Sequence, residues 1–274
     1  MRTRVVLALL AIAGLAAAQN PAIRSSNGVL NGASFQTGMP VTGGSLISIF
    51  GTQLASSIGQ ADSIPLSNSL GGASVQFVNG STTLNAPMLY AQPDDPANNV
   101  VSQINCQVPW ELVPAGTTAT VQVIVTNKGV TSSPQQVTVG PFSPGVFSSN
   151  GRAIAVNLDG TLAWPEGLIP NFPTHGAKPG DALIVYATGL GALDNTPADG
   201  AASLDKLRNT LTPPIVMIGG VSAQVLFSGL SPQFVGVNQL NIIVPNIPPN
   251  DNAPFQLQLG GFTTSDQITI SVTQ

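Results

Sequence analysis

The sequence predicts an all-β protein built from two tandem immunoglobulin-like β-sandwich domains that arose by an internal duplication. The segment QINCQVP from Gln103 returns as QLNIIVP from Gln239, an offset of 136 residues (239 minus 103). The segment GSLISIFGTQL from Gly44 returns as GDALIVYATGL from Gly180 with the same offset. Solenoid repeats are roughly 20–50 residues long, whereas this period is the size of a whole domain. We therefore expect each repeat to be a complete folding unit.

The second indication is period-two alternation of apolar and polar residues, bounded by Gly, Pro and Asn, with few helical patterns. In the first repeat it predicts strands at Leu46–Phe50, Ser74–Val78, Pro87–Ala91, Gln103–Val108, Thr118–Thr126 and Gln135–Val139. In the second it predicts strands at Ala182–Ala187, Ile215–Ile218, Ala223–Ser228, Gln239–Val244, Phe255–Leu259 and Gln267–Val272. Weaker strand patterns at Val29–Ser34 and Val156–Thr161 precede these sets, giving about seven strands per repeat, as in an immunoglobulin-like sandwich.

The turns between the strands also match in the two repeats. Asn79-Gly80 corresponds to Gly219-Gly220, and 127–129 corresponds to Gly260-Gly261. These residue types accept the positive φ of tight hairpins. Within the long connection 193–212, we expect a short helix at Ala201–Leu207.

The N-terminus predicts a secretory signal peptide over residues 1–18. Arg2 and Arg4 precede an apolar run from Val5 to Leu15, and small residues lead to a cleavage site after Ala18. The alternative is an uncleaved anchor, but the run is shorter than the about 20 residues that cross a bilayer. We predict a secreted chain, extracellular, periplasmic or at the cell surface, with no membrane span after cleavage. The domains would cover 19–147 and 148–274, joined by the stiff segment Pro141–Phe147.

The charge of the chain argues against nucleic acid as a partner. The formal net charge is −4, and cleavage would remove Arg2 and Arg4 to leave −6. Charged residues make up 7% of the chain, against about 25% in ordinary soluble domains, a composition that suits an extracellular β protein. The single cysteine, Cys106, cannot form an intramolecular disulfide, and its apolar surroundings predict a small buried residue.

Nothing in the sequence assembles a catalytic site, so we predict that the chain is not an enzyme. Nucleophilic hydrolysis requires a base beside the nucleophile, and the one histidine, His175, lies in a loop rich in Pro and Gly, where we expect it to be exposed. An extracellular hydrolase that uses paired carboxylates stays as an alternative. Most aspartates, however, stand beside Gly, Pro or Asn, where they cap turns.

We predict neither a cofactor nor a metal site. Two loops, 94–98 and 194–199, gather Asp and Asn residues that could offer oxygen ligands to calcium. Neither matches the spacing of an EF-hand loop.

The candidate ligand-binding residues are Trp110, Glu111 and Trp164. Each tryptophan lies beside Pro and Glu near the end of a predicted strand or in a loop. Exposed, these rings would stack on sugars or peptides, and a carbohydrate-binding module is therefore an alternative function. The structural interpretation is that each tryptophan covers the end of a sandwich or the interface between domains.

Several motifs occur in the order typical of one known family. They are NGASF at Asn31–Phe35, GSLISIFGTQLA from Gly44, QINCQVPWEL at Gln103–Leu112, SPGVF at Ser143–Phe147, DGTL at Asp159–Leu162, YATGLG at Tyr186–Gly191 and VGVNQLNIIVP at Val235–Pro245. On these motifs the chain resembles the Solibacter-type uncharacterised C-terminal domain of secreted acidobacterial proteins. The resemblance implies extracytoplasmic, immunoglobulin-like modules of the IPT/TIG kind with no established activity. One departure is the extra segment Asp94–Asn99 before the QIN motif, which leaves a shared binding loop in doubt.

Taken together, these observations predict a secreted, non-catalytic adhesion, binding or structural module at the cell surface or in the extracellular matrix. Its partner would be a surface polysaccharide or an extracellular protein.

Overall fold

The computed structural model describes residues 20–264 and 267–274, so the predicted signal peptide over 1–18 lies outside the described residues. The described part is nearly all-β, as predicted. Its helical content is one 3-10 turn, η1 (Pro96–Asn98). None of its helices is long and apolar enough to cross a membrane. The segment expected to form a helix, Ala201–Leu207, is irregular, and this prediction is wrong. It is held by side-chain bonds around Arg208 instead.

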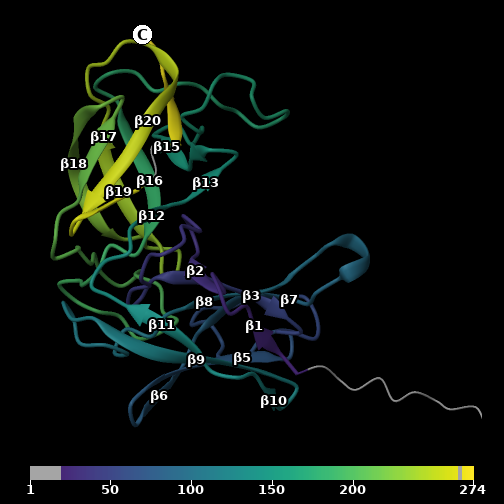
Figure 1. Ribbon diagram of the computed structural model, residues 1–274. Coiled ribbons are helices and arrows are strands. Elements are labelled where there is room, and N and C mark those ends of the chain that lie inside the picture. Colours follow the sequence, from purple (N-terminus) through teal and green to yellow (C-terminus); the bar gives the residue numbers. More distant parts are fainter. Residues whose placement is uncertain (1–19, 265–266) are drawn as a thin grey trace, which may run out of the picture.

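The first half forms two facing sheets (Figure 1). One sheet has the order β1-β3-β8-β7-β4, with β2 also on β3, and the other has the order β10-β9-β5-β6, with β11 also on β9. Their bounds are β1 Ala22–Ile23, β2 Val29–Asn31, β3 Leu46–Thr52, β4 Gly59–Gln60, β5 Ala73–Asn79, β6 Thr82–Asn85, β7 Met88–Gln92, β8 Ser102–Gln107, β9 Ala119–Asn127, β10 Val130–Thr131 and β11 Gln135–Val139.

The second half is one continuous sheet path that folds over itself, in the order β12-β16-β19-β18-β17-β20-β22-β14-β13. β15 also pairs with β16, and β21 with β20. The bounds are β12 Gly145–Val146, β13 Ser148–Ser149, β14 Arg152–Ala153, β15 Ala155–Asn157, β16 Ala182–Thr188, β17 Ile215–Ile218, β18 Val221–Leu230, β19 Asn238–Ile243, β20 Asn250–Leu259, β21 Phe262–Thr263 and β22 Thr269–Val272.

All the strands predicted in the two repeats are present, with ends that differ by a few residues. The predicted hairpin turns are also present, and Gly219-Gly220 and Gly260-Gly261 have positive φ. The strands that the sequence did not predict are short, such as β4 and β12. A two-residue strand carries too little alternation to be read from its sequence.

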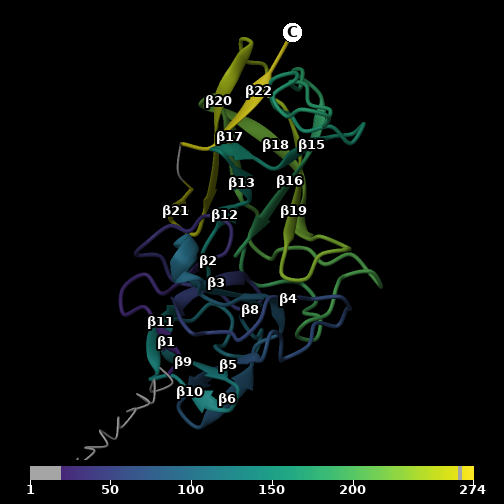
Figure 2. The same ribbon diagram turned by 90° about the vertical axis from the view of Figure 1, so that its right-hand side faces the viewer.

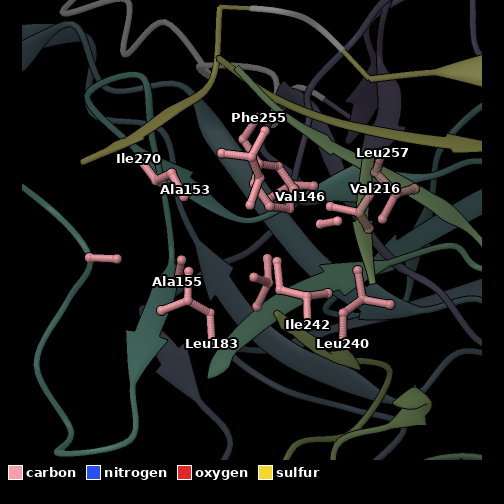
Figure 3. Close-up of a cluster of buried hydrophobic side chains, with 14 of the residues drawn as sticks. Val146, Ala153, Ala155, Leu183, Val216, Leu240, Ile242, Phe255, Leu257 and Ile270 are labelled. Atoms are coloured by element: carbon pink, nitrogen blue, oxygen red, sulfur yellow. The ribbon is translucent and has the colours of Figure 1, made fainter. Parts of the chain in front are cut away.

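Two hydrophobic cores lie between the layers, one drawn from residues 41–139 and the other from 146–272. In the second core, side chains of β17, β20 and β22 face those of β15, β16 and β19 across the sandwich (Figure 3). Phe255 is buried at its centre (Figure 3). Val146 of β12 belongs to this second core, whereas the predicted domains meet between residues 147 and 148. That division stays a prediction.

The two halves repeat one pairing pattern. Ile47 pairs with Cys106 between β3 and β8, and Leu183 pairs with Ile242 between β16 and β19, so both partners are displaced by the offset of 136 seen in the sequence. They differ at β18, a single strand that pairs with β17 through Val221–Ala223 and with β19 from Gln224 onward, whereas in the first half two separate strands, β6 and β7, pair with β5 and β8. Duplication as the origin of this pattern stays a prediction.

Candidate functional site

The junction between the two halves is the place where side chains from distant parts of the sequence converge. In Figure 2 the loops of the second half that follow β16 and β18 lie against the first half near β4. Three groups of hydrogen bonds join the halves there. In each group, a buried or half-buried polar side chain or a backbone group of a loop forms hydrogen bonds across the junction.

The first group surrounds Asn31, at the end of β2. Its Nδ2 donates to the carbonyl oxygen of Ser143 at 2.7 Å, and its Oδ1 accepts from the backbone nitrogen of Ala33 at 2.8 Å. Gly145 packs so closely that an added Cβ would lie 2.3 Å from Asn31 Oδ1. The buried amide therefore fixes the chain where it enters the second half.

The second group is a hydroxyl bridge at Thr188, the last residue of β16. The Leu46 backbone nitrogen donates to Thr188 Oγ1 at 3.0 Å, and Thr188 Oγ1 donates to the Gly236 carbonyl oxygen at 2.7 Å. Thr188 is fully buried. The Thr188 hydroxyl thus accepts a hydrogen bond from the first half and donates one within the second half, so that it has a partner both as donor and as acceptor.

The third group involves the loop at Asp199 and Gly200. Asp199 Oδ1 accepts from the Trp110 backbone nitrogen at 2.9 Å. Gly200 donates from its nitrogen to Gln107 Oε1 at 2.7 Å and accepts at its oxygen from the Leu66 nitrogen at 2.9 Å. Gly200 has φ +73, a conformation that favours glycine. The loop therefore contacts two separate segments of the first half.

Trp110 and Glu111 lie at this third contact. The Trp110 ring covers Gly44 so closely that a Cβ there would lie 2.1 Å from the ring. Its indole Nε1 is buried and has no hydrogen-bond partner among the described residues. The ring lines a cavity of about 80 Å³ together with Pro141, Gly191 and Thr196. That volume holds a few water molecules.

Asp199 is the acid with the most altered environment at the junction. Partial burial, and then the neighbouring Glu111 carboxylate, raise its pKa to about 6, against an ordinary value of 3.8, while the hydrogen bond from the Trp110 nitrogen acts in the opposite direction. A half-buried carboxyl beside a like charge holds its proton more tightly. Asp199 therefore binds its proton at a higher pH than an exposed aspartate does.

Trp164 is in a different place and a different environment. It is 4% exposed, and its Nε1 donates to the Ala153 carbonyl oxygen at 2.7 Å within the second half. A ring this buried has no face for stacking on a ligand. The structure thus brings Trp110 and Glu111 together with Asp199, and it places Trp164 within the packing of the second half.

A separate apolar groove of about 490 Å³ opens between the halves. We call it the junction groove. Its lining residues are Leu46, Ala61, Asp62, Ser63, Ile64, Leu66, Leu89, Gln233, Phe234, Val235 and Val237. Ile64 and Phe234 are each 50% exposed, and the Phe234 ring meets Tyr186 edge-on with centroids 5.8 Å apart. Asp62 is the charged residue of the lining.

Sequence reasoning did not find the junction groove. Its walls come from loop segments 61–66 and 233–237, which are far apart in the chain, together with single residues of β3 and β7. Isolated apolar residues in such loops are common on protein surfaces. The exposed large side chains Ile64 and Phe234 are the signal that was available, and only the fold brings them together.

The remaining candidates from the sequence are engaged locally. His175 Nε2 lies 2.9 Å from Asp159 Oδ2 at the surface, which lowers the pKa of that carboxyl to about 2. The carboxylate of Asp194 accepts from Asn209, and that of Asp95 accepts from Ala97 and Asn98. The Asp95 contacts cap a turn, as the sequence predicted, whereas the Asp194 and His175 contacts join residues 15 and 16 positions apart. Among the described residues no three His, Cys, Asp or Glu side chains gather as metal ligands.

A scan against models of protein families and a search of curated proteins both find no match. Among solved structures, the chain is similar to domains 5–6 of the S-layer protein SbsC (TM-score 0.27, 10% identity, 93% of this chain and 99% of that one). It is also similar to the plexin A4 extracellular region (0.26, 12%, 93% of this chain and 16% of that one) and to the C-terminal domain of the Streptococcus agalactiae polypeptide BspA (0.20, 10%, 93% and 100%). The chain spans only 16% of the length of the plexin region. TM-scores this low establish no common function.

Proposed function

We propose that this chain is an extracytoplasmic, non-catalytic module that binds or supports other components at the cell surface or in the surrounding matrix. The observation that carries the proposal is the junction itself. Buried hydrogen bonds at Asn31, Thr188 and Gly200 hold two sandwiches together, so that the surfaces beside the junction have a fixed shape. Pre-organisation of this kind lowers the entropic cost of binding a partner.

The signal-peptide pattern and the resemblance to the Solibacter-type family support the extracytoplasmic part of the proposal. A surface on which few side chains are charged also fits a role outside the cell. The partner would be a surface polysaccharide or an extracellular protein.

The hydrolase alternative requires two carboxylates that act on a substrate held between them. Glu111 and Asp199 are close enough to interact with each other, and Asp199 is also bonded to the Trp110 backbone. Glycosidases keep their two carboxyl groups about 5–10 Å apart to accommodate the sugar and water. The cavity of about 80 Å³ beside Trp110 is lined by neither carboxyl group. This geometry favours a structural role for the pair.

The carbohydrate-binding alternative now depends on Trp110. The proposal is tested by a binding screen of the chain from Gln19 against cell-wall polysaccharides and isolated cell envelopes, with and without calcium. The polysaccharides test for a glycan ligand, and the envelopes test for any other surface component. We expect saturable binding to at least one fraction. Trp110→Ala would abolish glycan binding if the ring is the ligand platform, with Leu158→Ala, a change at an exposed residue away from the junction, as the control. Absence of saturable binding to every fraction would contradict the proposed function.

A further inference from the structure

A clamped loop beside the junction groove displays two leucines to solvent. We call residues 203–208 the leucine loop. Arg208 is buried, and its Nη1 and Nη2 bond the two carboxylate oxygens of Asp205 at 2.6 and 3.1 Å. Arg208 Nη1 also donates to Ser203 Oγ at 3.0 Å, and that hydroxyl donates to the Lys206 carbonyl oxygen at 3.0 Å. The loop is therefore ordered by internal bonds that involve neither leucine.

Leu204 and Leu207 are 73% and 70% exposed on this loop. A single exposed leucine is ordinary on a protein surface. Two of them on a loop that a buried arginine holds in place form a pre-organised apolar projection, which loses little conformational entropy on docking. Lys206 lies between them in the sequence and is also exposed.

The leucine loop is bonded to the segment that leads into the wall of the junction groove. The Ser203 nitrogen donates to the Pro232 carbonyl oxygen at 3.2 Å, and Pro232 directly precedes Gln233 and Phe234 of the groove wall. The loop does not fill the groove of its own chain, because its leucines stay exposed and none of its residues lines the groove. A projection and a cavity on adjoining segments can each be filled when two copies meet about a two-fold axis.

The charged residues of the groove and the loop also indicate that a second copy of the chain fills the groove. The groove lining contains one charged residue, Asp62. Two charged residues stand between the leucines of the loop: Asp205 is paired with the buried Arg208, which leaves Lys206 as the exposed charge without a salt bridge among the described residues. Only 7% of the residues of this chain are charged, so an acid at the cavity and a base on the projection form a specific complement. We infer that a second copy of this chain occupies the junction groove, with Leu204 and Leu207 in the groove and Lys206 facing Asp62, in a symmetric dimer.

This inference goes beyond the proposed function, because self-association needs no surface ligand. Sedimentation velocity of the chain from Gln19, over a concentration series in plain buffer, should show a monomer–dimer equilibrium. Leu204→Ser combined with Leu207→Ser should weaken the dimer at least about tenfold, since two apolar side chains leave the interface. Leu158→Ser removes a side chain that is 75% exposed elsewhere and should leave the equilibrium unchanged.

Charge reversal tests the orientation of the two copies. Asp62→Lys and Lys206→Asp should each weaken the dimer by about threefold or more, because each places like charges together at the rim. The double variant should recover most of the loss. A wild-type chain that stays monomeric throughout, a dimer indifferent to the leucine changes, or a double variant no better than the singles would each overturn the inference. All these sites are exposed, so melting temperatures equal to that of the wild type, measured at concentrations where the chain is monomeric, verify folding. The polysaccharide screen reports on the proposed function separately.

Discussion

Replacing Asp199 with Asn should stabilise the protein at neutral pH and leave it unchanged in acid. The pKa of Asp199 is raised to about 6 from 3.8. Because the folded-state pKa lies above the unfolded value, the stabilisation from its bound proton is complete below about pH 4 and is lost as the pH rises through about 6. At pH 7 the ionised carboxylate therefore weakens the fold.

The magnitude follows from the shift of about two units, which corresponds to roughly 3 kcal/mol at 1.36 kcal/mol per unit. Asp199 is only about half-buried, and solvent screening reduces this to about 1 kcal/mol. Asn keeps an oxygen that can accept from the Trp110 nitrogen, and its amide can donate to Glu111. We therefore expect the free energy of unfolding of Asp199→Asn at pH 7 to rise by about 1 kcal/mol, and Tm to rise by about 2–4 °C.

Chemical and thermal unfolding of wild type and Asp199→Asn between pH 4 and pH 8 provides the measurement. The free energy of unfolding of the wild type should fall relative to that of the variant as the pH rises from 4 to 6. At pH 4 the two proteins should be equally stable. Glu166→Gln, at an exposed acid of the second half, is the control. A variant that is less stable than wild type at pH 7, or that keeps the wild-type pH dependence, would refute the reasoning.

Three further predictions concern other parts of the molecule. Asn31→Ala should lower the free energy of unfolding by about 2 kcal/mol or more, because it leaves the Ser143 carbonyl and other buried groups unpaired; a change under half of that in denaturant titration would contradict the junction's role. Cys106 should resist a thiol reagent in the folded protein and react only on unfolding, since burial raises the pKa of its thiol; rapid labelling of the native chain would disprove this. The Gly176 carbonyl first and Asp159 second raise the pKa of His175, so an NMR titration should show a lower pKa in Asp159→Asn, and an unchanged value would contradict the contact.

The fold was largely predictable because alternation is a local signal. Strands such as β5 and β11 carry the period-two pattern over their own length, so their bounds could be read without knowledge of their partners. The turn Gly260-Gly261 was predictable for the same reason, since positive φ restricts the residue type at that position. The helix predicted at 201–207 is wrong because the Ala and Leu residues of the segment favour a helix, whereas hydrogen bonds from the Arg208 side chain stabilise an irregular loop.

The candidate site was only partly predictable. Trp110 stood out by its residue type, but its contact with Asp199 joins positions 89 apart in the sequence and has no local signature. Trp164 had the same local signature and is buried, because exposure is set by the tertiary packing around it. The junction groove needs both halves in place before its walls meet.

Backbone ¹⁵N NMR relaxation on the chain from Gln19 tests the central claim, that the junction fixes the two halves as one body. The account predicts a single rotational correlation time shared by amides of the first and second cores, and a separation of the two values in a variant that combines Asn31→Ala with Thr188→Val. Different, shorter correlation times for the two halves of the wild-type protein would show that they move independently, and would contradict the account.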